Sequence, residues 1–212
     1  MRGLYLLHLR KEWPLLLFPA AVIYGLLLPV QSQILSQPSV STEELMRICG
    51  DSQRYLLLFA VWNMYPAFRL LLSRELKEAT DGSLQAGRIR WGILFQGFYL
   101  LGLSPYLLWL YRETAPEGFG LGAALLPLQT TEMALLTVFF MLLLRSAPGG
   151  MAAAAGWHLY SFGGLPMPDV LRTGRVGIPA AVWEKNWYLC RFLCITFFLA
   201  AGSFLEKRKA VR

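Results

Sequence analysis

The sequence predicts an all-α integral membrane protein, with about six transmembrane helices in one domain that covers residues 1–212. Hydrophobic residues make up 56% of the chain and charged residues only 16%, and the mean hydropathy is +0.45. Soluble domains carry about 25% charged residues. The apolar residues also form long runs, and about 20 of them are needed to cross a bilayer core as a helix. Both observations argue against a soluble core.

The apolar runs predict spans that lie, in chain order, at 13–30, 55–72, 91–111, 121–144, 151–165 and 187–205. The fourth run contains Pro127, which predicts a kink or an outer part that lies in the membrane interface. The fifth run is short and rich in Ala and Gly, a composition that favours close helix packing over lipid exposure. Five spans is therefore the competing count.

Before the first span, residues 1–12 mix Leu and Tyr with Arg, His and Lys, and they predict a short interfacial helix. The first apolar run is longer than the core of a signal peptide, and no small-residue cleavage site follows it. We therefore expect this segment to remain part of the membrane domain.

Two outer loops are predicted between the spans, at 31–54 and 164–186. The first contains Ser-Thr-Glu-Glu, which predicts the start of a helix with Ser41 or Thr42 as its N-cap. The second contains three prolines and predicts a re-entrant or interfacial element. Each loop either covers an exit path or is a simple external connection.

The distribution of basic residues predicts the orientation, since Lys and Arg are retained on the cytoplasmic side. With six spans, 13 of the 20 basic residues lie on one side and 7 on the other. This bias places both termini and the segment 73–90 in the cytoplasm of a multi-pass protein of the cell membrane. The net charge of +7 then indicates topology and contact with anionic membrane lipid. Nucleic acid is not an expected partner, because no aromatic and basic pattern for single-strand binding is present.

The motif search gives no catalytic, metal or cofactor site. No Walker phosphate loop, HExxH or CxxC occurs, and His8 and His158 are far apart. Cys190 and Cys194 are one helical turn apart and are interpreted as packing residues. Asp81-Gly82 with Ala86 matches the start of the CDP-alcohol phosphatidyltransferase motif, but the downstream aspartates that hold two metals are missing.

Glu132 lies inside the fourth predicted span and Arg191 just inside the sixth, both toward the outer face. Burying a charge in a membrane is costly, so such residues are candidates for function. They either pair with each other across the bundle or line a polar exit route. The alternative is that each reaches the interface with its charged end, as we expect of Arg69. His158 is interpreted as a hydrogen-bonded packing residue.

Between the second and third spans the chain turns charged and reads Ser-Arg-Glu-Leu-Lys-Glu-Ala-Thr over 73–80. These residues are mostly strong helix formers, and Gly82 is suited to end a helix in a left-handed cap. A short cytoplasmic helix is predicted, with a solvated loop as the alternative.

The order of these features resembles the type-2 ABC transporter permeases. Members of that family share an amphipathic N-terminal helix, two spans, and a cytoplasmic coupling helix that commonly reads E-x-x-x-G-T-L before the third span. The corresponding residues here are Glu78, Gly82, Ser83 and Leu84. A small-residue fifth span, a re-entrant-like outer loop and a basic tail continue the resemblance. The chain departs from the family in its shorter length and in the short distance from Gly82 to the third span.

The resemblance implies a permease subunit that exports a peptide or an amphipathic, lipid-like molecule. Its partners would be cytoplasmic ABC ATPase subunits, which bind the ATP and Mg²⁺, and a second permease subunit, identical or not. This chain itself would hold no cofactor. The residues implied to contact the ATPase are Arg74, Glu75, Lys77, Glu78, Asp81, Gly82, Ser83 and Leu84. The alternatives are a non-transporting membrane anchor or sensor that recruits a soluble partner through this segment and, third, a membrane enzyme.

Overall fold

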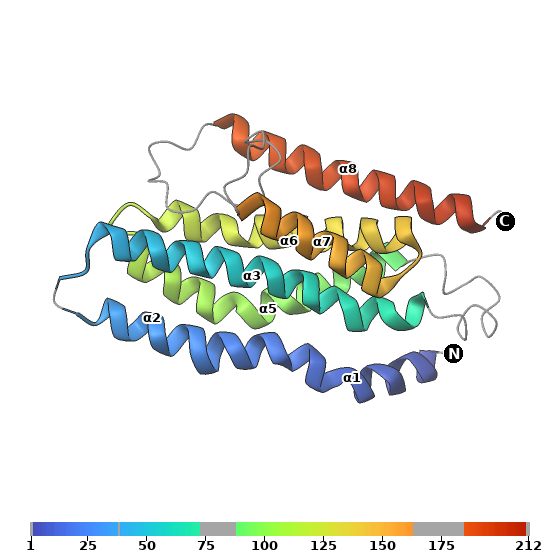
Figure 1. Ribbon diagram of the computed structural model, residues 1–212, viewed down its shortest axis with the longest axis horizontal. Helices are drawn as coiled ribbons and strands as arrows, with labels where there is room; N and C mark the ends of the chain where they lie inside the picture. The colour runs from blue at the N-terminus through green and yellow to red at the C-terminus, as the bar shows by residue number, and fades with distance from the viewer. Residues whose placement is uncertain (1, 38, 73–87, 163–184, 211–212) are drawn as a thin grey trace.

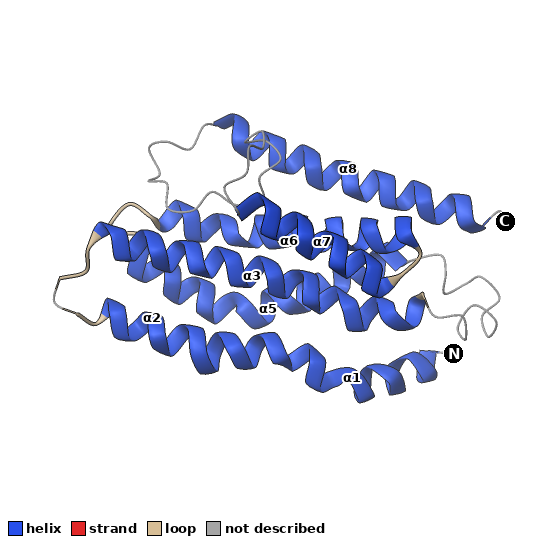
Figure 2. Ribbon diagram, viewed as in Figure 1, coloured by secondary structure: helices blue, strands red, loops and turns tan. Residues whose placement is uncertain are grey.

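In the computed structural model, residues 2–37, 39–72, 88–162 and 185–210 are described, and their regular structure is all helical (Figures 1 and 2). The predicted all-α class is therefore confirmed. The first helical segment consists of α1 (Arg2–Val22), the π-helical η1 (Ile23–Leu27) and α2 (Leu28–Leu35). The others are α3 (Thr42–Leu71), α5 (Arg88–Thr114), α6 (Gly120–Leu144), α7 (Ala147–Phe162) and α8 (Lys185–Ala210).

The helices form a bundle in which successive segments run in opposite directions (Figure 1). Helix α6 packs against α3, α5, α7 and α8, and α3 packs against α1, α5, α6 and α7. The segment α1–α2 and helix α8 lie on opposite sides of this centre. The start of α1, the end of α3, the start of α5 and the end of α8 all lie at one end of the bundle, which we call the terminal end. The other end is the far end.

Within the described ranges, three helical stretches are long and apolar enough to cross a membrane: Glu12–Leu35, Ile89–Thr114 and Gly120–Leu144. A shorter apolar stretch covers Arg191–Leu205. Large apolar side chains are exposed along the outer helices, among them Leu26 on η1, Phe98 and Leu101 on α5, and Phe197 on α8. Extended apolar surface of this kind is typical of contact with lipid or with another protein. These features suggest a membrane protein.

The prediction of a long outer loop at 31–54 is wrong. Helix α2 continues to Leu35 and α3 begins at Thr42, so the connection covers only residues 36–41. Charged residues suggested a loop because Arg47 and Arg54 interrupt the apolar pattern. They lie on the exposed side of α3, whereas Leu45, Ile48 and Ser52 are buried at helical spacing.

A capping box fixes the start of α3. The Ser41 backbone N–H donates to Glu44 Oε2 over 2.8 Å, and the Glu44 N–H donates to Ser41 Oγ over 3.2 Å. The Ser41 hydroxyl also donates to Glu44 Oε2, and these bonds hold the pKa of Glu44 below its ordinary value. Of the two predicted N-cap residues, Ser41 is therefore the one that caps α3.

The predicted interfacial helix at 1–12 is not a separate element, because α1 runs without a break from Arg2 into the apolar run. Two prolines inside α1, Pro14 and Pro19, do not end it. Pro19 has no N–H to donate to the carbonyl of Leu15, four residues earlier. The indole Nε1–H of Trp62 on α3 donates to that carbonyl instead, over 3.0 Å.

The predicted close packing of the fifth span is seen at the contact between α7 and α6. A Cβ built at Gly150 would lie 2.4 Å from the backbone of Met141, so only glycine fits there. Helix α6 ends at Leu144, and the C-cap residue Arg145 has a left-handed φ of 55°. The Ser146 hydroxyl then accepts from the N–H of Gly149 over 3.1 Å, which makes a tight connection.

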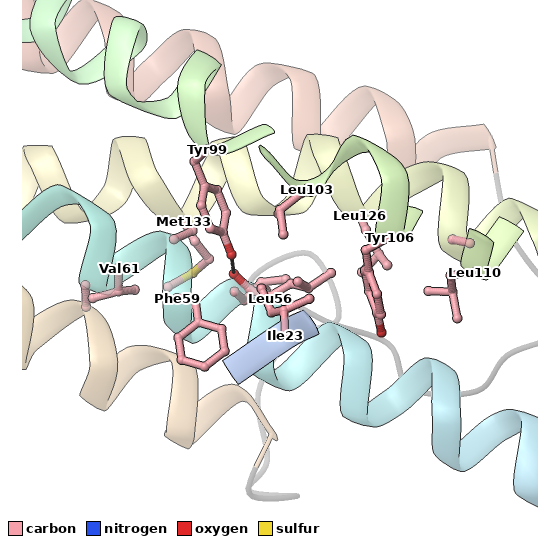
Figure 3. Close-up of a cluster of buried hydrophobic side chains, with 14 of the residues drawn as sticks. Ile23, Leu56, Phe59, Val61, Tyr99, Leu103, Tyr106, Leu110, Leu126 and Met133 are labelled. Atoms are coloured by element: carbon pink, nitrogen blue, oxygen red, sulfur yellow. Dashed lines mark hydrogen bonds between the residues drawn. The ribbon is translucent and has the colours of Figure 1, made fainter. Parts of the chain in front are cut away.

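The apolar core lies among α3, α5 and α6, with Ile23 of η1 inserted from one side (Figure 3). Tyr106 and Leu110 of α5 and Leu56 of α3 are fully buried. Tyr99 reaches across from α5 and donates its hydroxyl to the carbonyl of Leu56 over 2.8 Å. The buried hydroxyl is thereby satisfied without water.

Candidate functional site

Four consecutive polar residues lie about half-way along the otherwise apolar helix α6: Gln129, Thr130, Thr131 and Glu132, here named the QTTE segment. Three of them are buried and Thr131 is half-buried. Successive side chains on an α-helix point about 100° apart, since one turn takes 3.6 residues. The side chains of the segment therefore reach three neighbouring helices, α3, α5 and α8.

Gln129 connects α6 to the central helix α3. The amide Nε2 of Gln53 donates to Gln129 Oε1 over 2.7 Å, and both side chains are buried. A hydrogen bond of this kind between helices holds their axial positions relative to each other.

Thr130 and Thr131 connect α6 to α5. The amide Nε2 of Gln96 lies 3.4 Å from the Thr130 hydroxyl and 3.5 Å from that of Thr131. Both hydroxyls donate to the carbonyl of Pro127, over 3.0 and 2.7 Å. Gln96 therefore meets two hydroxyl oxygens whose protons are already committed to the backbone.

Glu132 connects α6 to α8 through Arg191. The guanidinium Nη1 lies 2.7 Å from Glu132 Oε1 and 2.9 Å from Oε2. Arg191 is 0% exposed and Glu132 is 4% exposed. Of the alternatives for these two residues, the structure contains the pair across the bundle, and the guanidinium does not extend to the surface.

Two polar atoms at this level have hydrogen-bonding capacity left. Gln96 Oε1, an acceptor, and Gln129 Nε2, a donor, are buried and have no hydrogen-bond partner among the described residues. A buried polar atom without a partner costs about 1–3 kcal/mol. Each of these two atoms therefore retains the capacity for one further hydrogen bond.

A second polar cluster lies toward the far end and is closed on itself. The Tyr106 hydroxyl donates to Gln31 Oε1 over 2.7 Å and lies 2.7 Å from Ser52 Oγ. Gln31 Nε2 lies 3.1 Å from the same Ser52 Oγ. This ring joins α2, α3 and α5 and leaves no group directed at a ligand, so its role is structural.

His158 has a packing role and Arg69 a surface role. His158 Nε2 lies 3.0 Å from the carbonyl of Arg54, and its ring contacts Phe162, in agreement with a hydrogen-bonded packing residue. Arg69 is half-exposed at the terminal end and pairs with the buried Glu12 at 3.5 Å. No group of three or more His, Cys, Asp or Glu side chains that could hold a metal occurs in the described ranges.

The residues implied to contact an ATPase, Arg74 to Leu84, lie outside the described residues, as does most of the predicted outer loop 164–186. The helices on either side of the predicted coupling segment are described, and the end of α3 and the start of α5 both lie at the terminal end of the bundle.

The uncharged members of the site were not predicted from the sequence. No role was predicted for these residues because single uncharged polar residues are common in spans. They are Gln53, Gln96, Gln129 and Thr130. The available signal was the run of four polar residues at 129–132 in an apolar helix. Comparison with known proteins adds nothing to this, since no family model, no curated protein and no solved structure matches the chain.

Proposed function

We propose that the chain is the membrane-spanning subunit of an ATP-driven ABC exporter that moves a peptide or an amphipathic, lipid-like molecule. It would act with a second permease subunit and with cytoplasmic ABC ATPases that hold the ATP and Mg²⁺. The observation that carries the proposal is the position of α3, since the predicted coupling segment follows directly from the helix at the centre of the bundle.

Helix α3 packs against α1, α5, α6 and α7, so a displacement of its terminal end acts on four neighbours at once. Its hydrogen bond from Gln53 to Gln129 transmits an axial shift to the QTTE segment. Helix α6 in turn holds α8 through Glu132 and Arg191. ATPase closure at the coupling segment would thereby move helices on both sides of the bundle.

We further propose that all six helical segments cross the membrane, with the terminal end in the cytoplasm. The charges of the described side chains support this orientation. The terminal end carries four arginines and one acidic residue with described side chains: Arg10, Arg69, Arg90, Arg145 and Glu12. The far end carries three arginines and five acidic residues: Arg47, Arg54, Arg112, Glu43, Glu44, Asp51, Glu113 and Glu117. An excess of basic residues favours the cytoplasmic side.

Co-purification tests the proposal. The tagged chain is extracted from its source membranes in mild detergent, and an ABC ATPase is expected to accompany it. The double variant Glu75→Ala/Glu78→Ala is expected to reach the membrane but to lose the ATPase. The matched control is Glu113→Ala/Glu117→Ala, which removes two exposed carboxylates from the far end and should keep the ATPase bound.

Absence of any ATPase from the purified complex would overturn the exporter proposal. If a different soluble protein is captured and is lost with Glu75→Ala/Glu78→Ala, the chain is a membrane anchor that recruits through the same segment. If both double variants recover the same amount of ATPase, residues 74–84 do not have the proposed coupling role.

A further inference from the structure

A groove of about 270 Å³ lies between α1 and α5, with α3 contributing to its lining. Leu16, Leu17 and Ala20 line it from α1, and Phe95, Phe98 and Gly102 line it from α5. Its walls are therefore almost entirely hydrocarbon. Both walls belong to helical stretches that are long and apolar enough to cross a membrane.

Hydrogen bonds hold the first helical segment to its neighbours at two points, one on each side of the lining residues 16–20. At one point, Trp62 donates to the carbonyl of Leu15, which Pro19 has left without its usual partner. At the other, the Tyr24 hydroxyl donates to the carbonyl of Gly102 over 2.6 Å. The two fixed residues of the first segment are nine positions apart, about 13 Å along a helix.

The two polar side chains in the lining are already engaged with the backbone. Asn63 Nδ2 donates to the carbonyl of Phe95 over 3.3 Å, and the Tyr99 hydroxyl donates to the carbonyl of Leu56. A polar headgroup or a peptide backbone would find few free partners there. A saturated hydrocarbon chain needs none.

We propose that this groove binds one acyl chain of a membrane lipid. The groove is continuous with an apolar surface that includes Phe98, 63% exposed, and Leu101, 72% exposed. An acyl chain is the apolar ligand that surrounds such a surface in a bilayer. The inference does not depend on an ATPase, because an anchor protein with the same helices would present the same groove.

Gly102 offers a direct way to fill the groove. The lining residues Phe95, Phe98, Tyr99, Gly102 and Leu103 follow the spacing of one helix face, and Gly102 lies near its middle. Gly97 lies on the opposite face of α5. A Cβ built at either glycine meets nothing within 4 Å, so Gly102→Leu and Gly97→Leu are a matched pair.

The test uses the full chain in phosphatidylcholine vesicles that contain a trace of a phospholipid with a diazirine in the middle of one acyl chain. After illumination, adducts are mapped by peptide mass spectrometry. We expect them to concentrate on 16–20 and 95–103, above the yield on the exposed α8 residues Phe192 and Phe197. Gly102→Leu should lower the groove adducts to the level of α8, and Gly97→Leu should leave them unchanged.

Adducts spread evenly over the exposed faces of the wild-type chain would overturn the proposal, since they would show ordinary lipid contact. So would groove adducts that persist in Gly102→Leu while that variant keeps the thermal unfolding temperature of the wild type. If Gly102→Leu fails to fold, Ala20→Leu, which fills the groove from the α1 wall, is mapped in its place and is judged by the same outcomes.

Discussion

At the scale of single residues, the Glu132–Arg191 pair is the most demanding feature of the molecule. Two charges removed from water interact strongly, but the cost of their desolvation is of similar size. Such a pair therefore specifies an arrangement more than it stabilises one. Here it fixes where α8 lies against α6, at the level of the QTTE segment.

Removing one member of the pair should be worse than removing both. We expect Arg191→Leu to lower the free energy of unfolding by about 3–5 kcal/mol, because Glu132 is left as an uncompensated buried charge. The double variant Glu132→Leu/Arg191→Leu should lose much less than the sum of the two single variants. Thermal unfolding in detergent measures this, with the exposed Arg145→Leu as a control of small effect. Additive losses would contradict an energetic pair.

At the scale of elements, the start of α3 should depend on pH. The pKa of Glu44 is lowered from 4.5 by its bonds to Ser41, so its carboxylate stabilises the helix start above the ordinary glutamate pKa. This stabilisation is lost as the pH falls through the lowered value. Ser41→Ala should cost about 1 kcal/mol and weaken the pH dependence. Unfolding temperatures of the wild type and Ser41→Ala on either side of pH 4.5 check this, and equal pH responses would refute it.

The contact between α6 and α7 provides a second prediction at this scale. Gly150→Ala places a methyl group against the Met141 backbone, and overpacking of this kind costs roughly 1–3 kcal/mol. Gly156→Ala on the same helix has open space at its Cβ and should be neutral, or stabilising by up to about 1 kcal/mol. Melting curves of the two variants in one detergent are compared. Equal behaviour would mean that α7 is not packed this closely.

The sequence predicted most elements because long apolar runs and glycine-rich runs have a direct physical meaning in membranes. The predicted helix start at Ser41 or Thr42 was not joined to the span predicted from 55, although one helix, α3, covers both. Charged side chains on the exposed side of a helix resemble a loop when only composition is counted. Only part of the candidate site could be predicted from the sequence. Glu132 and Arg191 stood out by charge, whereas Gln53 and Gln96 acquire meaning only when the fold brings them to the QTTE segment.

At the scale of the whole molecule, the proposed topology can be read by cysteine labelling. A cysteine placed at Glu117, exposed at the far end, should react with a membrane-impermeant maleimide added to intact cells. Cysteines at Arg90 and Arg145, exposed at the terminal end, should react only after the cells are opened. The background comes from the natural cysteines, so Cys49, Cys190 and Cys194 are first changed to Ala. Reaction of all three sites in intact cells would rule out the orientation.

The bond from Trp62 to the Leu15 carbonyl has a consequence for biogenesis. When α1 enters the bilayer alone, Pro19 leaves that carbonyl bare in hydrocarbon, where an unsatisfied backbone group costs several kcal/mol. During synthesis, the first donor that becomes available to this carbonyl is the Trp62 indole on α3. Helices α1 and α3 should therefore pair before α5 emerges from the ribosome. Cysteines at Phe18 and Phe59, whose rings lie 6.1 Å apart, would crosslink in a nascent chain stalled before α5 if this order of assembly holds.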